Sequence, residues 1–118
     1  MSILDLLPGD ARMTPLPAGE VIFAQGDHGD LMYVVAQGTA QILVEGKVVE
    51  TVGIGGIVGE MALIDAEPRS ATAITKTDCV LIPLDVERFA GLVARHPEFA
   101  LQVMRVLAHR LRRMDAER

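Results

Sequence analysis

Apolar residues recur at two different spacings along this chain, and the change comes near residue 85. Before it, short apolar runs alternate with turns rich in Gly, Asp and Pro, a pattern that is typical of a β-sandwich or small barrel. Strands are expected at residues 21–24, 31–36, 39–44, 47–52, 70–75 and 79–84. After it, apolar residues follow helical spacing, which predicts one helix capped by Asp85 and another beginning at Pro97.

Three smaller features complete this outline. Residues 2–7 resemble a short amphipathic helix, with Ser2 as its cap and Asp5 in its first turn. Glu45-Gly46 separates two strand-like runs and predicts a tight hairpin. The terminal helix carries an apolar stripe that is expected to pack on the sheets or on a second copy of the chain; its members are Phe99, Val103, Val106, Leu107, Leu111 and Met114.

The stretch 59–71 carries the candidate chemistry. Gly59 lets the backbone approach a ligand closely, and the start of a short helix at Glu60 would offer N–H groups to an anion. The fork of donors on Arg69 matches a phosphate, while Glu60 can accept a hydroxyl proton. A phosphate and a hydroxyl bound side by side describe a nucleotide sugar, although Glu60 and Arg69 could instead form a surface ion pair with each other.

The same stretch resembles the phosphate-binding cassette of cyclic nucleotide-binding domains. The resemblance rests on Gly-Glu-Met-Ala-Leu at residues 59–63 and Pro-Arg-Ser-Ala at residues 68–71, and it extends from about Leu16 to the C-terminus. The family includes the catabolite activator protein and the regulatory subunits of cAMP-dependent kinase. The resemblance implies that Glu60 takes the ribose 2′-hydroxyl and Arg69 the cyclic phosphate. The ligand-binding residues that it implies are Val58, Gly59, Glu60, Met61, Ala62, Arg69, Ser70 and Ala71, with Arg113 and Met114 as a cap over the base.

The resemblance also implies a fold and a function. The expected fold is mainly β with flanking helices: a jelly-roll-like β-roll, or double-stranded β-helix, at about residues 14–84, and C-terminal helices at 85–118 of a single domain 1–118. The expected function is that of a regulatory module, not an enzyme, which binds 3′,5′-cyclic AMP and repositions its C-terminal helices. Ser70 stands where cGMP-selective kinases of the family usually carry threonine, which favours cAMP and leaves cGMP open. A homodimer through the C-terminal helix is a further expectation.

Composition narrows the setting of this module. The chain has 118 residues, of which 50% are hydrophobic and only 3% aromatic, so one domain with an aliphatic core is expected. A formal net charge of −5 argues against duplex nucleic acid as a partner of this chain alone. No signal peptide or membrane-length apolar run is evident, and a cytoplasmic location is therefore expected.

Two other functions are alternatives for the same residues. A cupin-like metal-dependent enzyme shares the jelly-roll architecture but needs clustered ligands, whereas His28, His96 and His109 are scattered over a turn and two helical positions. We therefore expect no metal or cofactor besides the nucleotide. A degenerate jelly roll kept only for protein interaction is the other alternative. The turn at residues 25–30 lacks the ligand spacing of a calcium loop. The single cysteine, Cys79, is expected to be a buried apolar side chain. The basic run 110–113 is explained by the favourable effect of positive charge near the C-terminus of a helix.

Overall fold

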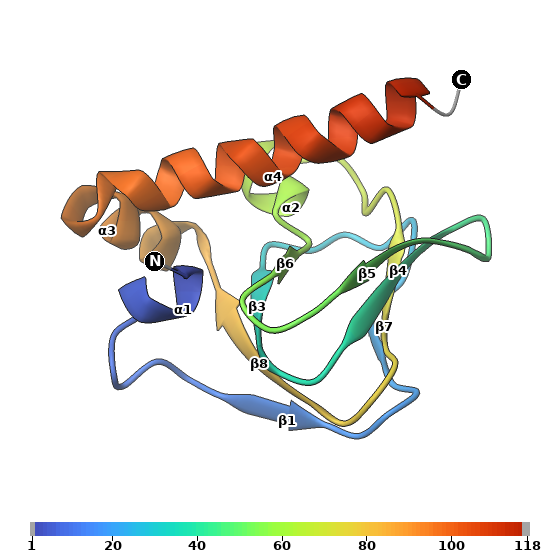
Figure 1. Cartoon of the computed structure of the whole chain (residues 1–118), viewed down its shortest axis with the longest axis horizontal. Coiled ribbons are helices and arrows are strands. Elements are labelled where there is room, and N and C mark those ends of the chain that lie inside the picture. Colours follow the sequence, from blue (N-terminus) through green and yellow to red (C-terminus); the bar gives the residue numbers. More distant parts are fainter. Residues whose placement is uncertain (1, 117–118) are drawn as a thin grey trace.

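Two antiparallel sheets face each other in the computed structural model, which describes residues 2–116 (Figure 1). The first sheet has the strand order β1-β8-β3-β6, and the second has the order β2-β7-β4-β5. The strands of the described chain are β1 (Thr14–Leu16), β2 (Val21–Phe23), β3 (Met32–Gln37), β4 (Ala40–Val44), β5 (Lys47–Val52), β6 (Ile57–Val58), β7 (Thr72–Thr75) and β8 (Cys79–Leu84). Its helices are α1 (Ile3–Leu6), α2 (Met61–Ile64), α3 (Val86–Arg95) and α4 (Pro97–Ala116).

The central strands β3 and β8 of the first sheet are largely buried on both faces. Alternate residues of a strand point to opposite faces, and neighbours such as Val34 and Val35 on β3 accordingly belong to two different apolar clusters. One cluster lies between the sheets and contains Val35, Val52, Val58, Ala73, Cys79 and Leu81. The other lies between the first sheet and the helices, where Met32, Val34, Ile57, Ile82 and Leu84 meet Leu92, Phe99 and Val103. The continuous apolar runs of β3 and β8 follow from this double burial.

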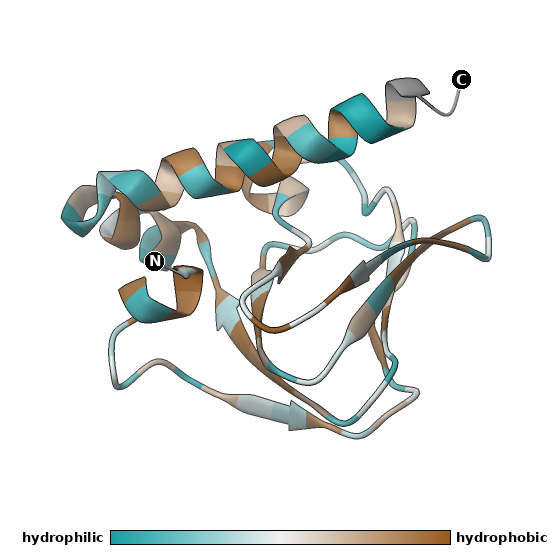
Figure 2. Ribbon diagram, in the orientation of Figure 1, coloured by the Kyte–Doolittle hydropathy of each residue, from teal (hydrophilic) through white to brown (hydrophobic). Residues whose placement is uncertain are grey.

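The helices lie together on one side of the roll (Figure 1). The first half of α4 belongs to the core, because Phe99 and Val103 are buried. The second half is different: Leu111 is 61% exposed and Met114 is 65% exposed. The apolar stripe predicted for this helix is therefore satisfied by the roll only in part. The hydropathy colouring in Figure 2 shows the alternation of apolar and polar residues along α4.

Most of the predicted elements are present. The expected mainly β roll with flanking helices is confirmed, and the strands expected at 47–52 and 79–84 have those bounds. Asp85 caps α3 by accepting a hydrogen bond from the Arg88 amide at 2.8 Å, and Ser2 caps α1 within a capping box. Both residues of the Glu45-Gly46 turn have positive φ, as the tight hairpin requires.

Two short strands, β1 and β6, were not predicted, and three strands begin later than expected. Strands β3 and β4 each begin one residue later, and the strand after Arg69 begins at Thr72 instead of Ser70. Both Ser70 and Ala71 lie in the bend that leads from Arg69 into β7. Among the described residues, no helix has the length and apolar character needed to cross a bilayer.

Candidate functional site: the cassette beneath the terminal helix

The candidate site begins where the paired strand β6 gives way to an irregular turn. Val58 is fully buried at the end of β6 and opposite Tyr33 of β3. Gly59 then adopts a φ of +77°, which side-chain-bearing residues rarely adopt. Glu60 follows at the N-cap of α2, the short helix that was expected here. The backbone reversal at Gly59 thus places Glu60 beside the roll, with only 4% of the residue exposed.

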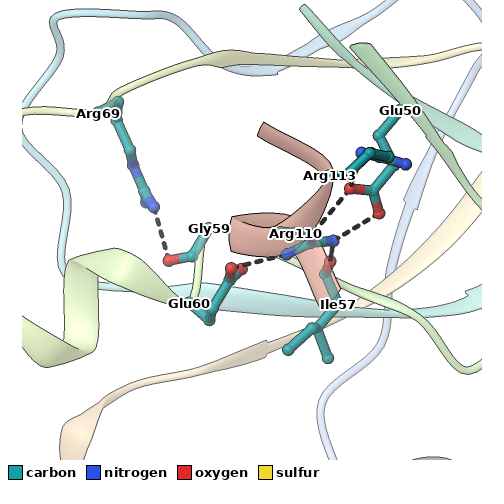
Figure 3. Close-up of polar contacts among 7 residues, drawn as sticks. All are labelled: Glu50, Ile57, Gly59, Glu60, Arg69, Arg110 and Arg113. Atoms are coloured by element: carbon teal, nitrogen blue, oxygen red, sulfur yellow. Dashed lines mark hydrogen bonds and ion pairs between the residues drawn. The ribbon is translucent and has the colours of Figure 1, made fainter. Parts of the chain in front are cut away.

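Arg69 approaches the same turn from the opposite direction. Its amide donates to the Asp27 carbonyl at 2.7 Å, and its own carbonyl accepts from the Gly26 amide at 2.8 Å, so its main chain is fixed to the loop between β2 and β3. Its side chain donates through Nη1 to the Gly59 carbonyl at 3.0 Å and through Nη2 to the Leu31 carbonyl at 2.8 Å. Figure 3 shows the guanidinium directed at Gly59.

This arginine is buried without a carboxylate partner. Only 9% of Arg69 is exposed, and within the described residues it forms no ion pair. Its Nε is buried and has no hydrogen-bond partner, while Cζ lies 4.1 Å from the centroid of the Phe23 ring. Burial lowers the pKa of Arg69 from its usual value, and the charges of nearby groups such as Asp30 and Asp27 offset part of this effect. A buried cation held by carbonyls and a ring is an arrangement that an incoming anion would complete.

Two glycines make room for the guanidinium. A Cβ on Gly29 would lie 2.5 Å from Nη2 of Arg69, and a Cβ on Gly59 would lie 2.6 Å from Nη1. Both distances are far below an ordinary non-bonded contact. Gly59 therefore has a role besides its positive φ: it leaves space for the side chain of Arg69. The corresponding role of Gly29 was not predicted, because the sequence presents it only as part of a turn.

Glu60 is paired with the terminal helix and not with Arg69. Its Oε1 accepts from Nη1 of Arg110 at 2.6 Å, and Oε2 accepts no hydrogen bond within the described chain. The alternative in which Glu60 and Arg69 form an ion pair with each other is therefore wrong. The two residues lie on either side of the Gly59 turn, and each has its own partners (Figure 3).

Arg110 joins the cassette to strand β5. Besides Glu60, it contacts Glu50 through Nε at 2.8 Å and Nη2 at 2.9 Å, and Nη2 also donates to the Ile57 carbonyl at 2.7 Å. Arg113, one turn further along α4, donates to the same Glu50 at 2.8 Å. Two arginines of α4 and two carboxylates of the roll thus form one connected network, which Figure 3 shows around the end of the helix.

The electrostatics of this network favour the charged forms. Burial alone would raise the pKa of Glu50, but the hydrogen bonds and charges of Arg110 and Arg113 hold it below its usual 4.5. Burial alone would lower the pKa of Arg110, and its bonds to Glu50 and Glu60 raise it instead. The bidentate contact between Arg110 and Glu50 is the geometry in which guanidinium–carboxylate pairs are strongest.

The other residues of the predicted site fall into two groups. Met61 and Ala62 open α2, with Met61 exposed, and Ser70 and Ala71 lie in the bend after Arg69. Arg113 is turned toward Glu50 through an ion pair, whereas Met114 is largely exposed. All of the predicted residues remain predictions as ligand contacts.

Sequence reasoning missed the residue that links the site to α4. Arg110 stands in the basic run that was attributed to a favourable helix terminus, and nothing local distinguishes it from Arg112 or Arg113. Its partners Glu50 and Glu60 are far away in sequence. The available signal was geometric: Val103 and Arg110 are seven positions apart, so the two side chains share one face of the helix.

The possible metal ligands of the described chain are dispersed. Among residues 2–116, no three or more His, Cys, Asp and Glu side chains are grouped so that they could hold a metal ion. The cupin-like alternative requires such a group.

The cassette lies within a segment that matches a known protein family. Residues 13–96 match the model of the cyclic nucleotide-binding domain. The chain belongs to the cyclic nucleotide-binding domain family. The resemblance seen in residues 59–71 is thereby confirmed, and the chain is a regulatory domain of this family.

Individual members of the family are similar over most of the chain. A CRP-like cAMP-activated global transcriptional regulator from Mycobacterium tuberculosis is 32% identical over an alignment 119 residues long, which covers 97% of this chain and 53% of the relative. The crystal structure of the Thermus thermophilus catabolite activator protein superimposes with a TM-score of 0.81 and 35% identity, covering 91% of this chain and 53% of that one. A cAMP-bound PfPKA-R structure gives a TM-score of 0.78 at 26% identity, with coverage of 89% and 36%.

The cyclic nucleotide-binding domain described here spans about half the length of the curated regulator that it matches, 53% in the case of the Mycobacterium tuberculosis protein. The similarity therefore concerns about half of that relative. The similar proteins are regulators, among them a transcriptional regulator that is named as cAMP-activated.

Proposed function

We propose that this domain binds 3′,5′-cyclic AMP, with Arg69 holding the cyclic phosphate and Glu60 the ribose 2′-hydroxyl. The observation that carries the proposal is the buried guanidinium of Arg69, which has no carboxylate partner among the described residues and one N–H without a partner. A buried cation without a counter-ion is costly. The single negative charge of a cyclic phosphodiester would supply that counter-ion.

The state of Glu60 fits the second half of the proposal. One of its carboxylate oxygens is bound to Arg110, and the other accepts no hydrogen bond within the described residues. A carboxylate has lone pairs for several donors. A ribose hydroxyl can therefore bind to Glu60 without the loss of the Arg110 contact.

A sensor function follows if the nucleotide favours one position of the helices over another. The contact between Arg110 and Glu60 gives α4 a direct connection to a residue that we assign to the ligand. Binding of cAMP is therefore proposed to change the packing of α4 by raising the fraction of molecules in which this helix is docked on the roll. We also propose that the domain prefers cAMP to cGMP, and the support for this preference is the serine at position 70.

The proposal is tested by two substitutions measured by calorimetry. Arg69→Leu is expected to weaken cAMP binding by about 2–5 kcal/mol, the usual cost of removing one partner of a buried charge contact. Glu60→Gln is expected to cost less, about 1–3 kcal/mol, the scale of a hydrogen bond to a charged group. Arg112→Leu removes the same charge from an exposed position and serves as the matched control. Unchanged cAMP affinity in folded Arg69→Leu would show that the phosphate lies elsewhere.

We further propose that two copies of the domain associate through α4. Exposed residues recur along this helix at the spacing of a coiled-coil seam, at positions Leu101, Met104, Ala108 and Leu111. This seam differs from the stripe predicted from the sequence: Phe99 and Val103 of that stripe are buried in the roll, and Leu111 is the residue common to both sets.

A further inference from the structure

Glu50 is the centre of the ion-pair network at the end of α4. It projects from β5, an edge strand of the second sheet, and its side chain is 17% exposed. Three hydrogen bonds from α4 end on this one carboxylate, two from Arg110 and one from Arg113. None of the roles proposed for the nucleotide site involves Glu50.

The bonds of Arg110 divide unequally between Glu60 and the rest of the roll. Arg110 makes four hydrogen bonds, and only the one from Nη1 goes to Glu60. The other three go to Glu50 and to the Ile57 carbonyl. A ligand that alters the Glu60 contact therefore leaves most of the attachment of Arg110 in place.

The last turns of α4 have little apolar contact with the roll. Among the residues of this helix whose side chains the structure describes, Leu107 is the last that packs against the apolar cluster beneath it. Beyond it, Leu111 and Met114 are mainly exposed. The attachment of this segment therefore depends on the ion pairs at Arg110 and Arg113, and both of those residues bind Glu50.

We propose that Glu50 is a positioning residue that holds the end of α4 on the roll in the ligand-free domain, and that it thereby sets the apparent affinity for the nucleotide. This proposal rests on the proposed function, because it treats the docked helix as the arrangement that binds. A ligand that binds one arrangement has an apparent affinity reduced by the fraction of molecules that are in the other. Glu50 raises the docked fraction without itself contacting the ligand.

The test combines Glu50→Gln with a substitution on the helix side of the same contact. Glu50→Gln removes the negative charge and leaves a side chain of nearly the same size on β5. Arg113→Gln removes one of the three hydrogen bonds that α4 donates to Glu50. Arg112→Gln, the exposed neighbour on α4, is the matched control. Circular dichroism establishes that each variant is folded before it is compared.

Hydrogen exchange of residues 107–114 is measured first without ligand. Glu50→Gln is expected to accelerate exchange about tenfold or more, because the loss of a charge-assisted hydrogen bond changes the equilibrium between docked and released helix by about that factor. Arg113→Gln is expected to accelerate it about two- to fivefold, as for a partly exposed pair. Arg112→Gln should match the parent.

Titration with cAMP provides the second measurement. The apparent affinity of Glu50→Gln for cAMP is expected to fall in proportion to the fraction of molecules in which α4 is docked. Saturating cAMP is expected to restore the protection of α4 from exchange. Parent-like exchange of α4 in folded Glu50→Gln would overturn the proposal, and so would tighter cAMP binding, which would make the network an inhibitory contact. Absence of cAMP binding in the parent would refute the proposed function, whereas the ligand-free exchange would still report on the anchoring by Glu50.

Discussion

Gly29 provides a test of how the site positions its arginine without removing the arginine itself. The φ of Gly29 is not in the left-handed region, so alanine fits the backbone there. The added Cβ would lie 2.5 Å from Nη2 and 2.7 Å from Nε of Arg69. Non-bonded atoms ordinarily stay about 3.5–4.0 Å apart, so the guanidinium must move by about 1 Å. A hollow of about 230 Å³ borders Arg69 and gives it room to do so.

The cost of this movement should appear in binding and not in stability. Displacement of the guanidinium disturbs its contacts to Leu31 and Gly59, which are 2.8 and 3.0 Å long. A displaced guanidinium also loses its alignment with the proposed phosphate. Loss of one charged hydrogen bond to that phosphate corresponds to about 1.5–3 kcal/mol, or roughly a 10- to 100-fold weaker affinity for cAMP. The free energy of unfolding should change by less than about 1 kcal/mol, because alanine also restricts the unfolded chain.

Calorimetric titration with cAMP and thermal unfolding measure the two effects separately. Gly53→Ala is the matched control, since a Cβ at Gly53 meets nothing within 4 Å and its φ is likewise ordinary. If Gly29→Ala binds cAMP within a factor of about two of Gly53→Ala, the reasoning fails, because the observed position of Arg69 would not matter for binding.

Three further expectations follow from the network, the site and the helix surface. In the folded domain the pKa of Glu50 lies below its usual 4.5. The contribution of Glu50 to the docking of α4 is therefore complete above pH 4.5, and it is lost as the pH falls through the lowered pKa. Exchange of α4, corrected for intrinsic rates, should therefore be constant from about pH 6 to 8 and rise only in acid; a rise within the neutral range would contradict this assignment. Cyclic AMP incubated with the pure domain should be recovered unchanged by chromatography, and conversion to AMP that co-purifies with the domain would refute a purely binding role. Met104→Glu should convert a dimer to a monomer in sedimentation experiments while Arg105→Glu does not, and an equal effect of both would exclude the proposed seam.

The sequence was most informative where structure depends on neighbouring residues. Turns at Glu45-Gly46 and the cap at Asp85 rest on local backbone preferences, and both are present in the structure. The cassette could be recognised for the same reason, since its residues lie within a single stretch. Strand β6 was missed because two residues are too few to display alternation, and its pairing with β3 defines it.

The connections of the site to the rest of the fold could not be predicted in this way. Arg110 resembles its basic neighbours until the fold brings Glu50 and Glu60 to one side of α4. Gly29 belongs to an ordinary turn until Arg69 is placed against it. Each of these relations joins residues from separate elements, and their spacing in the sequence carries no signal of contact.

Calorimetric titration of the unmodified domain with cAMP, cGMP and AMP is the most direct test of the account. We predict saturable binding of cAMP at one site per chain, weaker binding of AMP, and loss of the cAMP signal in Arg69→Leu. The buried guanidinium of Arg69 is the reason for this prediction, because it lacks an anionic partner in the described chain. No saturable binding of cAMP, or binding that survives unchanged in Arg69→Leu, would contradict the central claim.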